Sequence, residues 1–208
     1  MKLALAATTL ATASAFVGTS PAAAPSALSA ASYDPSDFSD AANLPGVLDP
    51  TGFFDPAGFA ADASESELKR FREAEIMHGR VAMLATVGFL VGESGATPLF
   101  DGAINGIAIN QFWQVPTSFW PVMALFTSVP ETFRALRGWK EPTVSENYFV
   151  LREGYTPGDI DFDPLGLKPD DAIELKEMQT KELQHGRLAM LAAAGMIVQE
   201  LQTGNTLF

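Results

Sequence analysis

The sequence contains one helix-like segment twice, 107 positions apart. Residues 73–84 read EAEIMHGRVAML and residues 180–191 read TKELQHGRLAML, and about half of the positions are identical between 67–93 and 174–200. The repetition extends into the preceding loops, where Phe-Asp-Pro at 54–56, with a glycine two residues on, recurs at 162–164. Two copies of one loop–helix unit predict two crossed helices related by a pseudo-two-fold axis.

Each copy places three strongly polar residues at the head of an apolar run. They are Glu75, His78 and Arg80 in the first copy and Glu182, His185 and Arg187 in the second. Glutamate and histidine at i and i+3 share a helix face, whereas an arginine at i+5 lies on the other side. Arg80 therefore does not reach Glu75. The two-fold instead predicts one ion pair between Glu75 and Arg187 and a second between Glu182 and Arg80, so that each buried carboxylate is neutralised across the crossing.

Small residues recur beside these charges and allow the two helix backbones to approach closely. They are Gly79 and Ala82 in the first copy and Gly186 and Ala189 in the second. Exposed surface salt bridges would also explain the charged residues. They would not explain why a histidine is duplicated with them.

Three helical segments are predicted, at about 66–93, 112–139 and 171–202, and acidic, Pro- and Gly-rich loops separate them. Pro121 and Pro130 fall inside the second segment and should kink it. Only 18% of residues are charged, against roughly a quarter in soluble domains. Three long helical segments without strand alternation predict an all-α protein in which the first and third helices are crossed. Hydropathy alone does not show that these helices cross a membrane, because the apolar run at 81–92 is shorter than a span, and charges at membrane depth would mark a site.

The N-terminal residues differ from the rest. Residues 1–15 have the layout of a signal peptide, and residues 16–30 form an Ala- and Ser-rich segment that resembles the second part of a bipartite plastid leader. A plain secretory signal followed by a disordered segment is the alternative interpretation. The functional domain is therefore expected at 31–208. A net charge of −12 argues against nucleic acid as a partner, and the absence of cysteine excludes thiolate metal sites and disulfides.

The repeated residues suggest metal ligation of a particular kind. An arginine-neutralised carboxylate and an imidazole one turn away are both Lewis bases, but a neighbouring arginine repels a bare dication. Magnesium inside a macrocycle is formally neutral, which favours a chlorin pigment. A di-iron carboxylate protein shares the Glu-x-x-His pattern but needs two further glutamates, and the remaining helix offers only Glu131. A hydrolase lacks support, because the chain has no Gly-x-Ser-x-Gly motif.

With these motifs, the chain resembles the light-harvesting chlorophyll-binding protein family. The resemblance rests on EAEIMHGRVAML, KELQHGRLAML, FDPLGL at 162–167 and GFFDPAGF at 52–59, and it extends from about Leu44 to the C-terminus. The segment KPDDAIELKEMQTKELQHGRLAML is similar to the fucoxanthin chlorophyll a/c branch. The resemblance implies chlorophyll a, chlorophyll c and fucoxanthin or a related xanthophyll as cofactors. It also implies an all-α membrane protein with three transmembrane helices, the first and third crossed about a pseudo-two-fold axis. The implied location is the plastid thylakoid, with other antenna subunits, a photosystem core and thylakoid lipids as partners.

The resemblance also implies roles for individual residues. The implied chlorophyll ligands are Glu75, His78, Glu131, Glu182, His185 and Gln199. The implied ion-pair partners of the ligand glutamates are Arg187, Arg134 and Arg80. Asp55-Pro56 and Asp163-Pro164 would cap carotenoid ends, although turn chemistry alone also explains them.

Two positions depart from the family pattern: Met123 stands where plant antennas have a ligand glutamine, and His185 stands where they often have an asparagine, although histidine is still a competent ligand. The repeat itself is also imperfect, because Gly92 stands where Gln199 stands in the second copy.

The implied activity is non-enzymatic: the protein fixes pigment positions so that excitation passes to a photosystem. A photoprotective member of the same family, which dissipates excitation, is the alternative. Acidic residues that protonate on acidification could switch such a protein, and Asp34, Asp37, Asp40 and the 159–171 cluster are available. The sequence does not separate harvesting from quenching.

Overall fold

The computed structural model describes residues 33–39, 41–94, 100 and 103–207. The predicted signal peptide and plastid-leader segment, residues 1–30, lie outside this part of the chain. In order, the elements are η1 (Ala41–Asn43), α2 (Glu65–Glu93), α3 (Ala108–Gln114), α4 (Phe119–Gly138), η3 (Ser145–Asn147) and α5 (Ala172–Thr203). Within the described residues the secondary structure is helical apart from two isolated β-bridges.

Local sequence signals determine where α2 and α5 begin and end. At the start of α2, Ser64 Oγ accepts the Glu67 N–H at 3.4 Å and Glu67 Oε2 accepts the Ser64 N–H at 2.9 Å, which is a complete capping box. At the end of α5, Gly204 adopts φ 65°, the left-handed conformation that commonly terminates helices. The predicted bounds of these two helices are correct to within one residue.

The middle segment is not the single helix predicted at 112–139. It consists of the short α3 and the longer α4, separated at Val115, which is extended with φ −66° and ψ 131°. The cause is Pro116, because the residue before a proline disfavours the helical conformation. Pro121 lies in the first turn of α4, where a missing N–H costs little. The helix then continues through Pro130 as one element.

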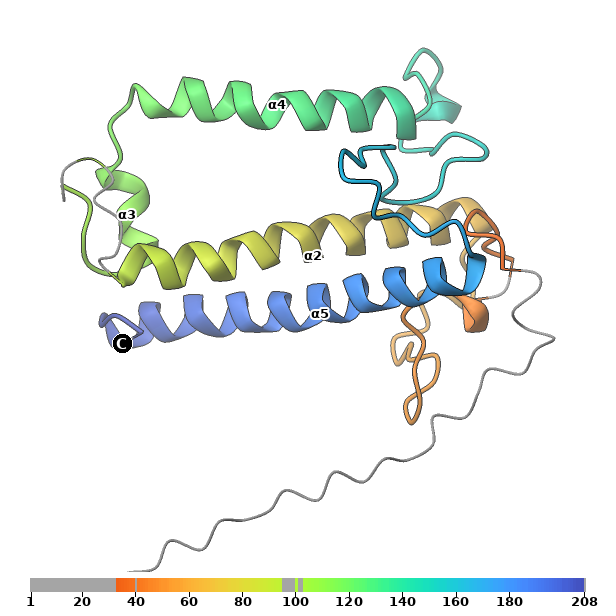
Figure 1. Ribbon diagram of the computed structural model, residues 1–208, viewed down its shortest axis with the longest axis horizontal. Helices are drawn as coiled ribbons and strands as arrows, with labels where there is room; N and C mark the ends of the chain where they lie inside the picture. Colours follow the sequence, from red (N-terminus) through yellow and green to blue (C-terminus); the bar gives the residue numbers. More distant parts are fainter. Residues whose placement is uncertain (1–32, 40, 95–99, 101–102, 208) are drawn as a thin grey trace, which may run out of the picture.

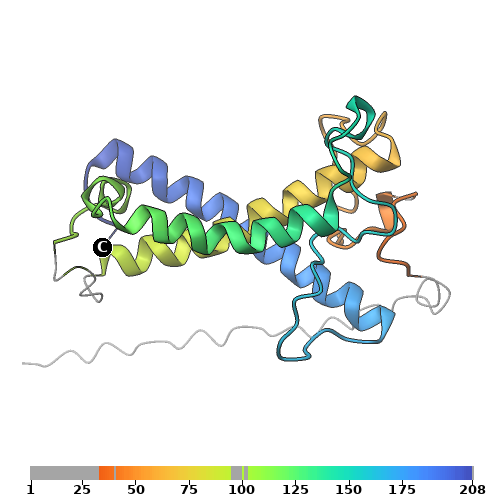
Figure 2. The same cartoon turned by 90° about the horizontal axis from the view of Figure 1, so that it is seen from above.

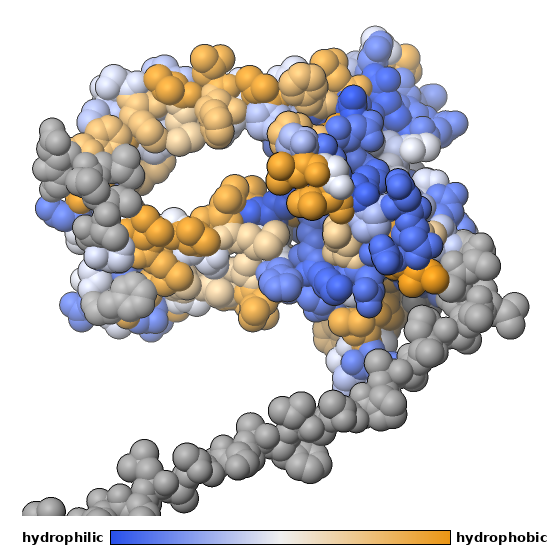
Figure 3. All heavy atoms as spheres, viewed as in Figure 1, coloured by the Kyte–Doolittle hydropathy of each residue, from blue (hydrophilic) through white to orange (hydrophobic). Residues whose placement is uncertain are grey.

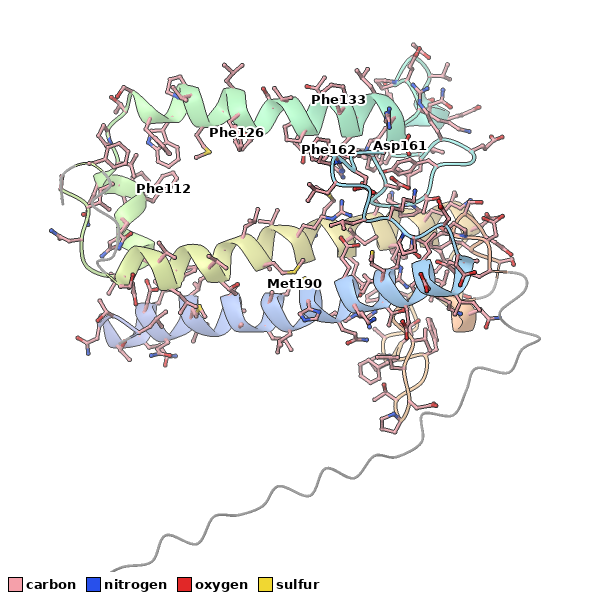
Figure 4. All side chains as sticks on the ribbon, in the orientation of Figure 1. Phe112, Phe126, Phe133, Asp161, Phe162 and Met190 are labelled. Atoms are coloured by element: carbon pink, nitrogen blue, oxygen red, sulfur yellow. The ribbon has the colours of Figure 1, made fainter. Side chains whose placement is uncertain are left out.

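Helices α2 and α5 lie side by side and cross near their middles (Figures 1 and 2). At the crossing, a Cβ built on Gly79 would lie 3.0 Å from Gly186 Cα, and the reverse distance is the same. No larger residue fits there without separating the backbones. A small apolar cluster of Ala82, Ala189 and Ala193 continues the contact along the helices. Met190 packs against it and lies between the two helices in Figure 4.

Helix α4 runs alongside α2 at a distance and is connected to it mainly at the two ends (Figure 1). Figure 3 shows an opening between the two helices, bordered by hydrophobic residues. Large apolar side chains of α4 are 51–76% exposed; they are Val122, Leu125, Phe126, Val129, Phe133 and Leu136. A helix so apolar and so little covered by protein requires an apolar partner such as lipid or cofactor.

Among the helices that the structure describes, α2 alone is long and apolar enough to be a candidate membrane span. Its best 18-residue window has a mean hydropathy of 1.3, and only 17% of that window is buried. A core helix of a soluble protein would be mostly buried, so this exposure favours contact with lipid or pigment.

Candidate functional site

The two predicted interhelical ion pairs are present at the crossing of α2 and α5. Arg187 Nε lies 2.7 Å from Glu75 Oε1, and Arg80 Nε lies 2.8 Å from Glu182 Oε1. Each arginine also donates from Nη1 to a loop carbonyl: Arg187 to Gly46 O at 2.7 Å and Arg80 to Gly158 O at 2.8 Å. Each guanidinium therefore binds one carboxylate of the other helix and one loop.

The two loops that receive these arginines are themselves a repeated feature. Gly46 and Gly158 each follow a proline and adopt φ of +88° and +81°, a conformation that favours glycine. The Gly46 N–H donates to Thr180 Oγ1 at 3.2 Å, and the Gly158 N–H donates to Glu73 Oε2 at 2.6 Å. Thr180 and Glu73 occupy equivalent positions in the repeat. The loop before each helix thus covers the arginine of the other helix.

Glu73 is a central residue that the sequence analysis did not identify. Its side chain is 1% exposed. It accepts hydrogen bonds from Arg134 Nε at 2.7 Å, from the Gly158 N–H and from the Tyr155 hydroxyl at 3.2 Å. Burial, together with the nearby Glu73 carboxylate, raises the pKa of Tyr155 to about 12. Glu73 therefore connects α2 to the C-terminal end of α4 and to the loop before α5.

Arg134 also forms the ion pair predicted from sequence. Its Nη1 lies 2.8 Å from Glu131 Oε2, one turn earlier on α4. The prediction was incomplete, because the same guanidinium binds Glu73 as well. Arg134 is thus shared between the buried Glu73 carboxylate and the half-exposed Glu131 carboxylate.

The two histidines have identical surroundings. His78 Nδ1 lies 2.7 Å from Ala74 O, and His185 Nδ1 lies 2.7 Å from Lys181 O, four residues back in each helix. A carbonyl only accepts, so Nδ1 carries a proton, and the lone pair of the neutral ring is then on Nε2. Both rings are exposed. A second hydrogen bond that fixes the tautomer in this way is typical of metal-ligating histidines.

The ligand carboxylates are less alike. Glu182 uses one oxygen for Arg80, whereas Glu75 binds Arg187 through Oε1 and Arg72 Nη1, at 2.9 Å, through Oε2. The repeat equivalent of Arg72 is Gln179. The first copy therefore has one more cationic side chain on its glutamate than the second copy has.

The predicted ligands are separate single donors along the helices. In the described part of the chain, no three or more histidine, aspartate or glutamate side chains are grouped so as to hold a metal ion. A di-iron site needs such a group, so this arrangement does not support that alternative. A single exposed histidine on each helix suits a metal whose equatorial positions are already filled by a macrocycle. The residues therefore fit chlorophyll magnesium.

The loops with the Asp-Pro motifs form matching turns. Asp55 accepts the Phe59 N–H at 3.2 Å and the Ala60 N–H at 2.7 Å. Asp163 accepts the Leu167 N–H at 3.0 Å and the Lys168 N–H at 2.8 Å. The turns project apolar side chains outward: Phe54 is 76% and Phe162 is 79% exposed. Figure 4 labels Phe162 on the segment that precedes α5, where this segment passes between α4 and α2.

A cavity of about 410 Å³ lies between this second loop and the crossed helices. Its walls come from residues 156–168, from the N-terminal half of α5 and from Arg72, Ile76 and Arg80 of α2. Asp159 and Lys168, also in its wall, form an ion pair at 2.5 Å. One groove of the crossed pair therefore lies beside the turn that is predicted to cap a carotenoid end.

Two further carboxylates, Glu93 and Glu200, hold the opposite end of the pair together and were also missed. Glu93 Oε1 accepts the Ala108 N–H at 3.1 Å, and Glu200 Oε2 accepts the Ile109 N–H at 2.8 Å. They are equivalent in the repeat, and Glu200 is 1% exposed. Both fix the start of α3 across the C-terminal ends of α2 and α5.

Comparison with known proteins agrees with this geometry. The family model described as "Chlorophyll A-B binding protein" matches residues 40–201. The light-harvesting complex stress-related protein 3.2 of Chlamydomonas reinhardtii is 51% identical over 171 residues, which cover 80% of this chain and 66% of that protein. The chain thus spans just under two thirds of that relative's length. The fucoxanthin-chlorophyll a-c binding protein of Isochrysis galbana is 51% identical over 165 residues, 78% of each chain. The chain belongs to the chlorophyll a-b binding protein family, a family of helical membrane proteins.

Proposed function

We propose that this protein is a light-harvesting antenna that holds chlorophylls and carotenoids in the thylakoid membrane. The observation that carries the proposal is the duplicated set of outward-facing donors at the crossing of α2 and α5. Each copy presents an exposed histidine with a fixed tautomer and a glutamate neutralised by the arginine of the other helix. These features are what single axial ligation of several chlorin magnesium ions requires.

Bound chlorophyll a and chlorophyll c would absorb light and pass the excitation on, with fucoxanthin or a related xanthophyll absorbing in the blue-green. The protein's part is ligation and geometry. His78, His185, Glu75, Glu182, Glu131 and Gln199 are the proposed ligands. Because α2 and α5 are fixed to each other by backbone contact and two ion pairs, ligands on the two helices keep constant separations.

The proposed membrane arrangement has three spans, α2, α4 and α5, with α2 and α5 related by a pseudo-two-fold axis. Reciprocal pairing supports it, because the arginines, glutamates and covering loops exchange partners between the two copies. Neither α2 nor α5 would be stable alone in lipid with its charges unpaired. The exposed apolar surface of α4 supports a third span whose cover is lipid and pigment.

The proposed location is the plastid thylakoid, reached through the leader at residues 1–30. The relatives from Chlamydomonas and Isochrysis are both named as chloroplastic. The proposed partners are other antenna subunits and a photosystem core. The Asp-Pro turns, with their exposed Phe54 and Phe162, are proposed to cap carotenoid ends beside the grooves of the crossed pair.

A photoprotective role is the second candidate, and the comparisons supply the reason to retain it. Two stress-related proteins of Chlamydomonas reinhardtii are 51% and 49% identical to this chain, as similar as the fucoxanthin-chlorophyll protein. Chlorophyll fluorescence lifetime of the pigmented protein at pH 7.5 and pH 5 distinguishes the two roles. An antenna keeps a long lifetime at both values, whereas a quenching protein shortens it at pH 5.

The ligand assignment is tested by refolding the protein with chlorophyll a, chlorophyll c and fucoxanthin and counting pigments per polypeptide. His78→Ala, His185→Ala and Gln199→Ala should each retain one chlorophyll fewer than the wild type. Gln202→Ala, an exposed position one turn from Gln199, is the matched control and should retain all pigments. Full pigment content in all three ligand variants would exclude the assignment.

A further inference from the structure

The repeat is broken at one proposed ligand. Gln199 is an exposed residue near the end of α5, and the equivalent position on α2 is Gly92, which has no side chain to offer. A strictly repeated scaffold would therefore lose one pigment site on α2.

Another glutamine occupies the place of the missing side chain. Gln111 of α3 packs against the C-terminal end of α2, and its Nε2 donates to Gly92 O at 2.9 Å. A Cβ built on Gly92 would lie 2.7 Å from Gln111 Oε1. The amide oxygen of Gln111 thus lies close to where a side chain at position 92 would begin. Glycine at position 92 is what permits this approach.

The hydrogen bonds of Gln111 fix the direction of its amide. Nε2 donates to two carbonyls, Gly92 O and Gly106 O, each at 2.9 Å, so both of its hydrogens are used and the oxygen cannot exchange places with it. Among the residues that the structure describes, none donates a hydrogen bond to Gln111 Oε1. Gln114, one turn on, differs: its Oε1 accepts the Asn105 N–H and its Nε2 donates to Asn105 O, both at 2.9 Å.

Open surface adjoins both glutamine positions. Gly88 lies one turn before Gly92, and Gly195 lies one turn before Gln199, on the same side of its helix in each case. A Cβ at either glycine would meet nothing within 4 Å. A flat macrocycle ligated from the next turn needs a strip of helix surface without side chains. Both copies of the repeat supply that strip.

Aromatic side chains stand next to Gln111. Phe112 follows it on α3 and packs against Trp120 of α4 with ring centroids 4.3 Å apart. Figure 4 shows Phe112 at the end of the opening between α2 and α4. Helix α3 therefore also carries apolar aromatic surface of the kind that a chlorin ring packs against.

We propose that Gln111 Oε1 is the axial magnesium ligand of a chlorophyll on α2, the counterpart of the pigment that Gln199 holds on α5. The ligand is supplied by α3 because position 92 is glycine. This inference rests on the proposed function, since it concerns one more site for the same class of pigment.

The test is pigment stoichiometry in refolded, gradient-purified protein, measured per polypeptide together with the absorption difference spectrum at 77 K. Gln111→Leu should hold one chlorophyll fewer than the wild type and lose a single red band. Gln111→His, which keeps a donor for one carbonyl and offers Nε2 as a ligand, should restore the pigment with a shifted band. Gln114→Leu, which disturbs the same helix without removing a free oxygen, should keep every pigment.

Full chlorophyll content in Gln111→Leu would overturn the inference. Equal losses in Gln111→Leu and Gln114→Leu, or no recovery in Gln111→His, would overturn it as well, since they would show that Gln111 only supports the fold of α3. Gln199→Leu in the same series separates the two levels of the argument. If it loses one chlorophyll and Gln111→Leu loses none, only the inference fails. If the wild type binds no chlorophyll, the proposed function fails.

Discussion

Removal of Glu182 should damage assembly far more than removal of His185, although each is a proposed chlorophyll ligand. Among the described residues, Glu182→Ala leaves the Arg80 guanidinium hydrogen-bonded only to Gly158 O, without an ion-pair partner in direct contact. The two side chains of the ion pair are 36% and 37% exposed. In the proposed membrane, that exposed part faces lipid and pigment. The loss of folding free energy is then closer to that of breaking a buried ion pair than to that of breaking a surface pair, and we expect about 3 kcal/mol.

His185→Ala removes a hydrogen bond to Lys181 O, a carbonyl that still accepts the helical backbone bond. The expected cost is about 1 kcal/mol. Since 1.4 kcal/mol corresponds to a factor of ten, the two variants should differ roughly 25-fold in the ratio of folded to unfolded protein. Each loses one ligand, so the contribution of the lost pigment largely cancels in the comparison.

The assay is refolding yield with pigments, combined with thermal unfolding followed by visible circular dichroism. Glu182→Ala should give the lower yield and the lower midpoint. Adding Arg80→Leu to Glu182→Ala removes the orphaned charge and should recover part of the loss. Equal yields for Glu182→Ala and His185→Ala, with no recovery in the double variant, would refute the ion-pair reasoning.

Three further perturbations test other parts of the account. Gly79→Leu should reduce folded yield by separating the helices, at a cost of about 2 kcal/mol, because its Cβ would lie 3.0 Å from Gly186 Cα; a wild-type yield would contradict the close crossing. Glu73→Leu should release the loop before α5, and the backbone amide of residue 158 should then lose protection from hydrogen exchange. Unchanged protection at that amide would show that the Glu73 carboxylate does not hold the loop. Burial raises the pKa of Asp159, but hydrogen bonds from Lys168 and a backbone N–H lower it more, so its net pKa lies below the usual value. Its contribution to stability is therefore present above about pH 4 and lost as pH falls through the lowered pKa. Thermal midpoints of the wild type and Asp159→Asn should differ at pH 6 and converge once the pH falls below the lowered pKa of Asp159; a constant difference would disprove this contribution.

The sequence alone was sufficient to predict that the two repeated helices cross and exchange ion-pair partners. A glutamate and an arginine five positions apart cannot pair within one helix. Because the motif occurs twice, each glutamate can instead pair with the arginine of the other copy, and the structure contains both of these ion pairs. The same repeat placed glycine at the crossing. The resemblance to the antenna family, drawn from these motifs, is confirmed by the family match.

The buried carboxylates could not be identified in that way. Glu73 lies in the polar N-terminal half of α2, where a lone glutamate usually faces water, and its three partners come from distant segments. The sequence does contain a signal for the loop that binds Glu73: a Pro-Gly pair precedes each copy of the repeated helix, at 45–46 and at 157–158. The break at Val115 was also missed. The predicted helix at 112–139 ran through Pro116, although a proline restricts the residue that precedes it.

The central claim is that the crossed pair exists to hold chlorophyll, and the most direct test is whether the folded protein binds it. The measurement is the fluorescence excitation spectrum of the purified protein in detergent, with its pigments extracted and counted. The account predicts several chlorophylls per polypeptide and a carotenoid band that sensitises chlorophyll a emission. A folded, monodisperse protein that is colourless after refolding with these pigments would contradict it.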